Sequence, residues 1–291
     1  MIKNVSILIG VITPRSLVSR ERIMALFSVW RNLPEEFTPT HYGFHEPINR
    51  PFSLENGEDV LPGALNLGHG NITMFKRNTR ISSLAFLAAR RAWNSRSNSF
   101  SIRLDYQHLA GRLDVVRSYV RMLFEALDGA YAFATLAGSK PFRDDEAGEV
   151  GGVLIPPVNF GDGLKYLTAI HWINVFGREY VDFFGKDVLG SLGAVPSNDG
   201  KSYWLQPADD PRDMFTESGI AYSQELKRRT LKPRAFWDRE FERRYDDEKL
   251  RLELANKLFV TPLYTDYETP VFDFSEIVLP RPNARPLDSD A

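Results

Sequence analysis

Apolar and polar positions alternate with recognisable periods along the first half of the chain. Residues 5–12 form a short, almost wholly apolar run, as a buried strand does. In residues 100–105, Phe, Ile and Leu alternate with Ser, Arg and Asp, the period of a half-buried strand. A weaker strand pattern covers residues 71–75, and residues 130–136 are predicted to form a further strand. We therefore predict four strands in this half.

Helical spacing predicts two longer helices between these strands. The first is capped by Ser19 and runs to Trp30, and the second is capped by Asp114 and closed by Gly129. Their apolar stripes are Ile23, Leu26, Phe27 and Trp30, and Val116, Tyr119, Val120, Leu123, Phe124 and Leu127. A shorter helix is predicted over residues 82–92. The order strand–helix–strand–strand–helix–strand is compatible with a split βαβ arrangement.

The second half is centred on the segment HWINVFGREYVDFFG, residues 171–185. A buried strand is predicted over residues 164–175, and Gly177 ends it. Residues 179–184 place Tyr180, Phe183 and Phe184 at helical spacing, and Gly185 can adopt the positive φ that ends a short helix. The pattern predicts a strand–turn–helix corner with an aromatic inner side.

The remaining segments are richer in turn-forming residues. Residues 34–70 are expected to form a long irregular excursion, and residues 202–205 a strand. A charged helix is expected over residues 235–258. We predict an α+β fold, with a mixed or antiparallel sheet covered by helices.

The predicted domain spans residues 1–261, and a Pro-rich extended tail follows over residues 262–291. Within the domain, two packed split-βαβ-like halves could lie at 1–137 and 164–261, joined by an acidic Gly/Pro connector over residues 138–163.

Composition favours an ordinary globular protein. Of 291 residues, 43% are hydrophobic and 25% charged, and the formal net charge is −2. No basic excess favours direct binding of nucleic acid. The chain has no cysteine, so thiolate chemistry and Cys-based zinc sites are excluded. The apolar start is too short for a membrane span and lacks a cleavage site, so we expect a cytoplasmic protein.

Two acidic groups stand out. Asp144, Asp145, Glu146 and Glu149 lie in the connector, where a solvated turn, a contact patch for a basic partner and a metal-dependent hydrolase site all remain open. Asp209, Asp210 and Asp213 fit a turn and helix cap, or a second partner contact. We predict no cofactor and no metal.

The histidines and tryptophans give little indication of a metal site or an interface. His41 and His45 are four apart, but Gly43 between them argues against the helix that would make them a metal pair. His171, in an apolar run, is expected in the core. Trp172 and Trp204 are also expected in the core, and an exposed one would be an interface anchor.

The segment HWINVFGREYVDFFGKDVL, followed by SYWLQP at residues 202–207, resembles the sequences of bacterial toxin-immunity proteins. It is most similar to the immunity protein 52 family, with type VI secretion immunity proteins as neighbours. The specific similarity covers residues 164–207. The resemblance implies an α+β fold and neutralisation of a nuclease toxin, and it carries over no catalytic residue.

The leading hypothesis is therefore a non-enzymatic immunity protein that blocks the active site or substrate groove of a type VI-secreted nuclease. Its predicted contacts are the two acidic groups and Trp204. The alternatives are a hydrolase that uses His171 or His69 with residues 144–149, and a structural or adaptor component of a secretion system. The toxin, the binding face and the oligomeric state stay open.

Overall fold

The computed structural model describes part of the chain. The described residues are 2–3, 5–15, 17, 20–43, 48–55, 71–76, 84–89, 98–138, 148–150, 153–155, 167, 169–232 and 235–236. Side chains are described for fewer of them, and those of strands β6, β9 and β10 are not. The connector residues 139–147, most of the predicted helix 235–258 and the tail 262–291 lie outside the described residues.

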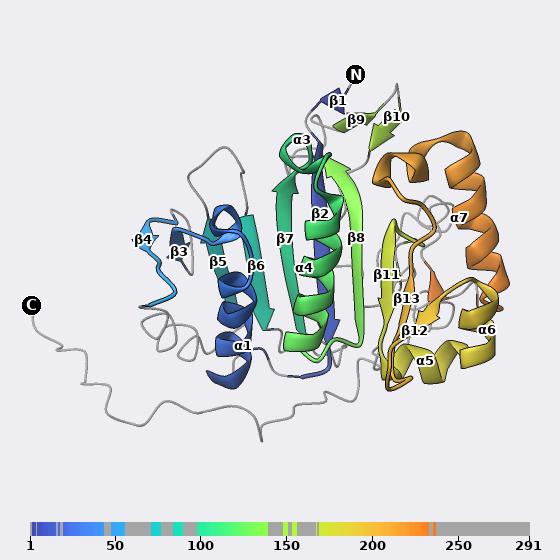
Figure 1. The fold of residues 1–291 in the computed structure, drawn as a ribbon, viewed down its shortest axis with the longest axis horizontal. Helices are drawn as coiled ribbons and strands as arrows, with labels where there is room; N and C mark the ends of the chain where they lie inside the picture. The colour runs from blue at the N-terminus through green and yellow to red at the C-terminus, as the bar shows by residue number, and fades with distance from the viewer. Residues whose placement is uncertain are drawn as a thin grey trace, which may run out of the picture.

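An antiparallel sheet of ten strands organises the fold (Figure 1). Its strand order is β12-β13-β11-β8-β2-β7-β6-β5-β3-β4. The bounds are Val5–Thr13 (β2), His41–Gly43 (β3), Arg50–Pro51 (β4), Asn71–Lys76 (β5), Leu84–Ala89 (β6), Asn98–Asp105 (β7), Tyr131–Gly138 (β8), Ile173–Phe176 (β11), Val195–Pro196 (β12) and Tyr203–Leu205 (β13). A smaller sheet joins Ile2–Lys3 (β1), Gly148–Val150 (β9) and Val153–Ile155 (β10).

The centre of the large sheet has the predicted split βαβ order. Helix α1 (Arg20–Arg31) follows β2, and α4 (Leu113–Ala126) connects β7 to β8. Strand β2 lies between β7 and β8, antiparallel to both, and β6 pairs with β7. Helices α1 and α4 lie on the same side of the sheet (Figure 1). Short elements η1 (Glu35–Phe37) and α3 (Tyr106–Leu109) complete this part. The predicted α+β fold is confirmed, and of the two predicted sheet types, mixed or antiparallel, the sheet is antiparallel.

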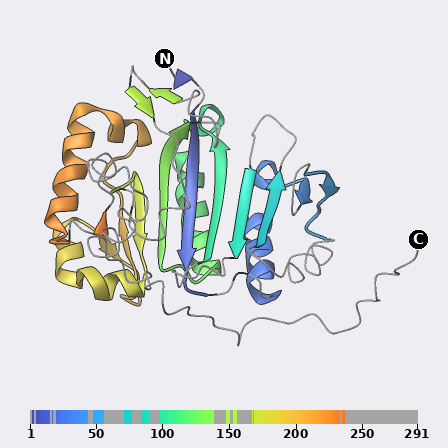
Figure 2. The same cartoon turned by 180° about the vertical axis from the view of Figure 1, so that it is seen from behind.

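The second half adds strands to the same sheet, since β11 pairs with β8. Its helices are α5 (Arg178–Phe184), α6 (Lys186–Ser191), η4 (Pro211–Phe215) and α7 (Glu217–Arg229). They gather at the β11–β13 end of the sheet (Figures 1 and 2). Gly185 has the positive φ predicted for it, 92°, and α6 begins directly after it. The strand before α5 is shorter than predicted and begins at Ile173.

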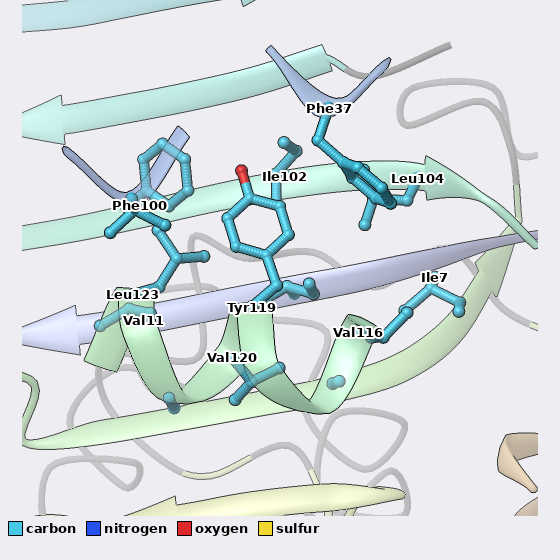
Figure 3. Packing of buried hydrophobic residues seen from close by; sticks show 14 of the residues in the cluster. Ile7, Val11, Phe37, Phe100, Ile102, Leu104, Val116, Tyr119, Val120 and Leu123 are labelled. Atoms are coloured by element: carbon cyan, nitrogen blue, oxygen red, sulfur yellow. The ribbon is translucent and has the colours of Figure 1, made fainter. Parts of the chain in front are cut away.

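Two apolar clusters cover opposite faces of the sheet, which explains why β2 is buried at all nine positions. Ile7, Ile9 and Val11 face the cluster under α1 and α4. Leu8 and Ile12 face the second cluster, which α5, α6 and α7 help to form. Tyr119 of α4 lies among the side chains of the first cluster (Figure 3). Its hydroxyl accepts a 2.6 Å hydrogen bond from Nε1 of Trp30.

Several local predictions were wrong for physical reasons. Residues 84–89 form β6, so pairing with β5 and β7 overrides the helix preference of their Ala and Leu residues. Asp114 lies in the first turn of α4, which begins at Leu113. Asp128, with φ 50°, takes the positive-φ position expected for Gly129. Its carboxylate contacts Arg15 and Arg22.

The predicted excursion over residues 34–70 also contains regular structure. Strands β3 and β4 extend the sheet beyond β5, and residues 44–47 and 56–70 lie outside the described part. His41 belongs to β3, while His45 is outside the described residues. Because His41 lies on a strand, it is not part of the helix that a metal-binding histidine pair would need, as the argument from Gly43 predicted.

Candidate functional site

The exposed side of α4 and the segment after β13 meet in a mixed polar and aromatic surface. We call it the Trp204 corner, and it comprises Arg117, Arg121, Trp204, Gln206, Asp209, Asp210, Arg212 and Asp213. Strand β13 carries Trp204, and pairing with β11 fixes the position of that residue opposite Val175. Three of the predicted carboxylates and the predicted tryptophan therefore lie within one stretch of the chain, from β13 to η4.

Trp204 is half-buried, and two arginines of α4 hold this side of the corner. The guanidinium carbon of Arg121 lies 5.4 Å from the centre of the Trp204 ring. Arg117 lies 5.6 Å from the ring centre of Trp172 and donates hydrogen bonds to Oε1 of Gln206 and the backbone oxygen of Asp209. Arginine over an aromatic face is an attractive cation–π arrangement. The Trp204 ring is therefore partly exposed and held in a fixed orientation.

Trp172, in contrast, is wholly buried, as predicted. Its Nε1 donates a 3.0 Å hydrogen bond to the backbone oxygen of Ala208. The side-chain nitrogen of Gln206 donates to the same oxygen. The loop that leads to the acidic turn is thus joined to the core by Trp172 and held internally by Gln206.

The acidic turn has one paired and two exposed carboxylates. Asp210 caps η4 and accepts two hydrogen bonds from the Arg212 side chain, at 2.9 and 2.6 Å. Burial raises the pKa of Asp210, but the hydrogen bonds from Arg212 outweigh it and lower the pKa below its usual value. Asp209 and Asp213 are exposed, and no side-chain hydrogen bond or ion pair joins them to the described residues.

Tyr106 supports this turn from α3. Its hydroxyl lies 3.4 Å from Oδ1 of Asp210. Burial, followed by the negative charge of Asp210, raises the pKa of Tyr106 to about 12. Tyr106 is therefore a neutral hydrogen-bond donor to Asp210 at physiological pH.

The connector carboxylates are not part of this geometry. Asp144, Asp145 and Glu146 lie outside the described residues. Glu149 lies on β9, where its backbone pairs with Lys3 and Leu154, and its side chain is outside the described part. The contact role of these four residues stays a prediction.

The arginines of the corner were missed at the sequence level. Arg117 and Arg121 are four residues apart and therefore share one face of α4. Their spacing was visible in the sequence, but their position against β13 depends on a sheet contact between distant segments.

His171 lies on the face of the sheet that the second apolar cluster covers, away from the corner. It is buried and stacks on Phe133, with 4.5 Å between ring centres. Burial lowers the pKa of His171 to about 3. Within the described part of the chain, no group of three or more His, Asp or Glu side chains could hold a metal ion.

This burial predicts a pH dependence of stability. Unfolded His171 binds a proton near pH 6.5, whereas folded His171 stays neutral down to about pH 3. Below pH 6.5 the unfolded state binds more protons, so the free energy of unfolding falls by up to about 1.4 kcal/mol per pH unit as pH drops. We expect His171→Phe to lack this part of the slope in urea unfolding between pH 6.5 and 4. Equal slopes in both proteins would contradict the burial of a neutral imidazole.

Comparison with known proteins gives a match in fold. A scan against protein families finds no match, and neither does a search of curated protein sequences. Among solved structures, the chain is similar to the T6SS (type VI secretion system) protein PA0821 of Pseudomonas aeruginosa, with a TM-score of 0.54 and 11% sequence identity. The similarity covers 78% of this chain and 72% of that protein. It shows a shared fold.

The sequence resemblance to the immunity protein 52 family is therefore not supported by a family match. In the described part of the chain, no helix is long and apolar enough to cross a membrane.

Proposed function

We propose that this chain is an immunity-type protein of a type VI secretion context, which binds a cognate toxin, of the nuclease class, and blocks it. The observation that carries the proposal is the Trp204 corner, where the segment from β13 to η4 carries a half-buried aromatic ring and two exposed carboxylates. Tryptophan is enriched at the energetic centres of protein interfaces. Exposed carboxylates accelerate association with a basic surface, such as that of an enzyme that binds nucleic acid.

Two further observations support this function. The structural neighbour is described as a T6SS protein and shares the fold over most of both chains. The segment that resembles immunity proteins, residues 164–207, supplies β11, β13 and Trp204, and thus the base of the corner. The segment with the resemblance therefore includes Trp204 and Gln206 of the candidate contact surface.

The experiment is co-expression of the tagged chain with the untagged products of genes encoded beside it. We expect one product to co-purify in a fixed ratio and to lose its toxicity and nuclease activity in the complex. Recovery of the chain alone, without rescue of cells poisoned by any neighbouring product, would refute the proposal.

The corner itself is tested by Trp204→Ala. Loss of a central tryptophan costs about 2 kcal/mol or more of binding free energy, which corresponds to a roughly 30-fold larger dissociation constant. Calorimetric titration of the partner measures it. Tyr222→Ala, at an exposed aromatic of α7, is the matched control and is expected to bind normally.

Because Trp204 also packs against the core, thermal unfolding must show that the variant is folded at the temperature of the titration. Asp209→Asn with Asp213→Asn is expected to slow association, and the difference from wild type is expected to shrink at high salt. Unchanged affinity in folded Trp204→Ala would place the contact elsewhere.

A further inference from the structure

The β12 end of the ten-stranded sheet carries an apolar row on the face that α4 covers. Val175, Trp204 and Val195 lie opposite one another on β11, β13 and β12, so their side chains share one face of the sheet. Val175 and Trp204 pack against the first cluster, which identifies this face as the α4 side. Val175 is 4% exposed, Trp204 is half-buried and Val195 is 63% exposed. The row therefore runs from the core to the surface at β12, the last strand of the sheet (Figure 1).

Val195 and Trp204 form one partly exposed apolar surface. Their Cβ atoms are about 5 Å apart, as in any directly opposed pair of residues on neighbouring strands. Val195 is among the few large apolar side chains that are exposed in the described part of the chain. Adjoining exposed apolar groups, unlike single ones, are typical of contact surfaces.

Strand β12 is closed to the addition of a further strand, although it lies at the edge of the sheet. The backbone nitrogen of Ser197 donates to the oxygen of Ser202, toward β13. Backbone groups alternate in direction along a strand, so those of Ala194 and Pro196 point outward. The nitrogen of Ala194 already donates to the backbone oxygen of Leu189, and proline has no N–H. A partner at this edge must therefore contact side chains.

Arg121 adds a cation to the apolar surface. Its guanidinium carbon lies 5.4 Å from the centre of the Trp204 ring, and the residue is exposed. Within the described part of the chain, no carboxylate and no hydrogen-bond acceptor pairs with it. Arg117, one turn earlier on α4, instead donates to Gln206 and to the backbone of Asp209. The donors of Arg121 are thus available to a partner.

We propose, building on the proposed function, that Val195, Trp204 and Arg121 form a side-chain docking surface for the cognate toxin. The part of the toxin that fits this surface presents an apolar side chain beside a carboxylate. The apolar side chain covers Val195 and the Trp204 ring. The carboxylate accepts hydrogen bonds from the guanidinium of Arg121, whose planar pair of donors matches it. The exposed carboxylates of the acidic turn act earlier, by attracting a partner whose overall charge is positive.

The test is a calorimetric titration of purified variants with the partner that co-purifies with the chain. Val195→Asp places a charge in the apolar contact and is expected to raise the dissociation constant at least about tenfold. Arg121→Glu repels the partner's carboxylate and is expected to do the same. Arg121→Lys keeps the charge without the planar pair of donors, so we expect a smaller loss than in Arg121→Glu.

Matched controls make the same changes elsewhere. Ile220→Asp on α7 and Arg178→Glu on α5 alter exposed residues and are expected to bind normally. Because Val195 is exposed, Val195→Asp is expected to melt within about 3 °C of wild type. A larger fall would show that the chain itself covers Val195, and would overturn the proposal.

The remaining outcomes separate this inference from the proposed function. A toxin that binds Val195→Asp and Arg121→Glu as tightly as wild type would overturn the docking surface and leave the immunity function standing. Absence of any partner would refute both. A dimer of the wild-type chain in sedimentation, lost in Val195→Asp, would assign the surface to a second copy of the chain and overturn the proposal.

Discussion

Replacing Asn174 with alanine is expected to lower the free energy of unfolding by about 4 kcal/mol, because the side chain satisfies buried groups from three segments. Asn174 is fully buried on β11. Its Oδ1 accepts hydrogen bonds from the backbone nitrogen of His171 and the hydroxyl of Tyr131. Its Nδ2 donates to the backbone oxygens of His171 and Leu205. Alanine leaves these groups without partners in the interior.

A second substitution separates the hydrogen bonds from the lost volume. Asn174→Leu fills the same space without polar atoms, so we expect it to be as destabilising as Asn174→Ala. Asn198→Ala, in the exposed turn between β12 and β13, is the matched control and is expected to stay within about 0.5 kcal/mol of wild type. Urea unfolding at pH 7.5 measures all three. Recovery of stability in Asn174→Leu would show that packing, and not the network, is what the side chain provides.

The strands and helices with strong periodicity could be predicted from the sequence. The apolar run of β2 predicts a buried central strand, and the apolar stripe of α4 predicts an amphipathic helix, and both elements are observed. Their order then restricts the sheet to a few arrangements, one of which is the split βαβ order observed.

What could not be predicted depends on contacts between distant segments. The run over residues 84–89 is a good helix by composition, and pairing on both edges makes it a strand. Likewise, the polar side of β7 would face water in an isolated half-buried strand. In the folded protein, Ser99, Ser101 and Arg103 on this side of β7 are buried.

The candidate site divides along the same line. The turn at Asp209–Asp213 could be predicted, because Asp followed by Pro is a local signal for a capped turn. The placement of Arg117 and Arg121 against the two tryptophans could not, because it requires the packing of α4 beside β13. Local chemistry predicted the carboxylates, and tertiary structure placed the two arginines of α4 over the tryptophan rings.

The strand–turn–helix corner after Asn174 depends on one glycine at close backbone approach. Gly177 donates a 2.7 Å hydrogen bond from its nitrogen to the backbone oxygen of Ala130. A Cβ atom at Gly177 would lie 2.4 Å from the backbone oxygen of Gly129 and 2.8 Å from that of Ala130. These atoms belong to the backbone that enters β8, so the overlap cannot be relieved by rotating a side chain.

Gly177→Ala is therefore expected to destabilise the protein by about 3 kcal/mol or more, because β8 and the start of α5 must move apart to admit one methyl group. Gly190→Ala in α6 is the same chemical change at a position where the added Cβ meets no atom within 4 Å. There we expect a gain of about 0.5–1 kcal/mol from the higher helix propensity of alanine. Thermal and urea unfolding of the two variants should thus shift in opposite directions. Equal small shifts would mean that β8 and α5 are not packed as closely as the Gly177 contacts require.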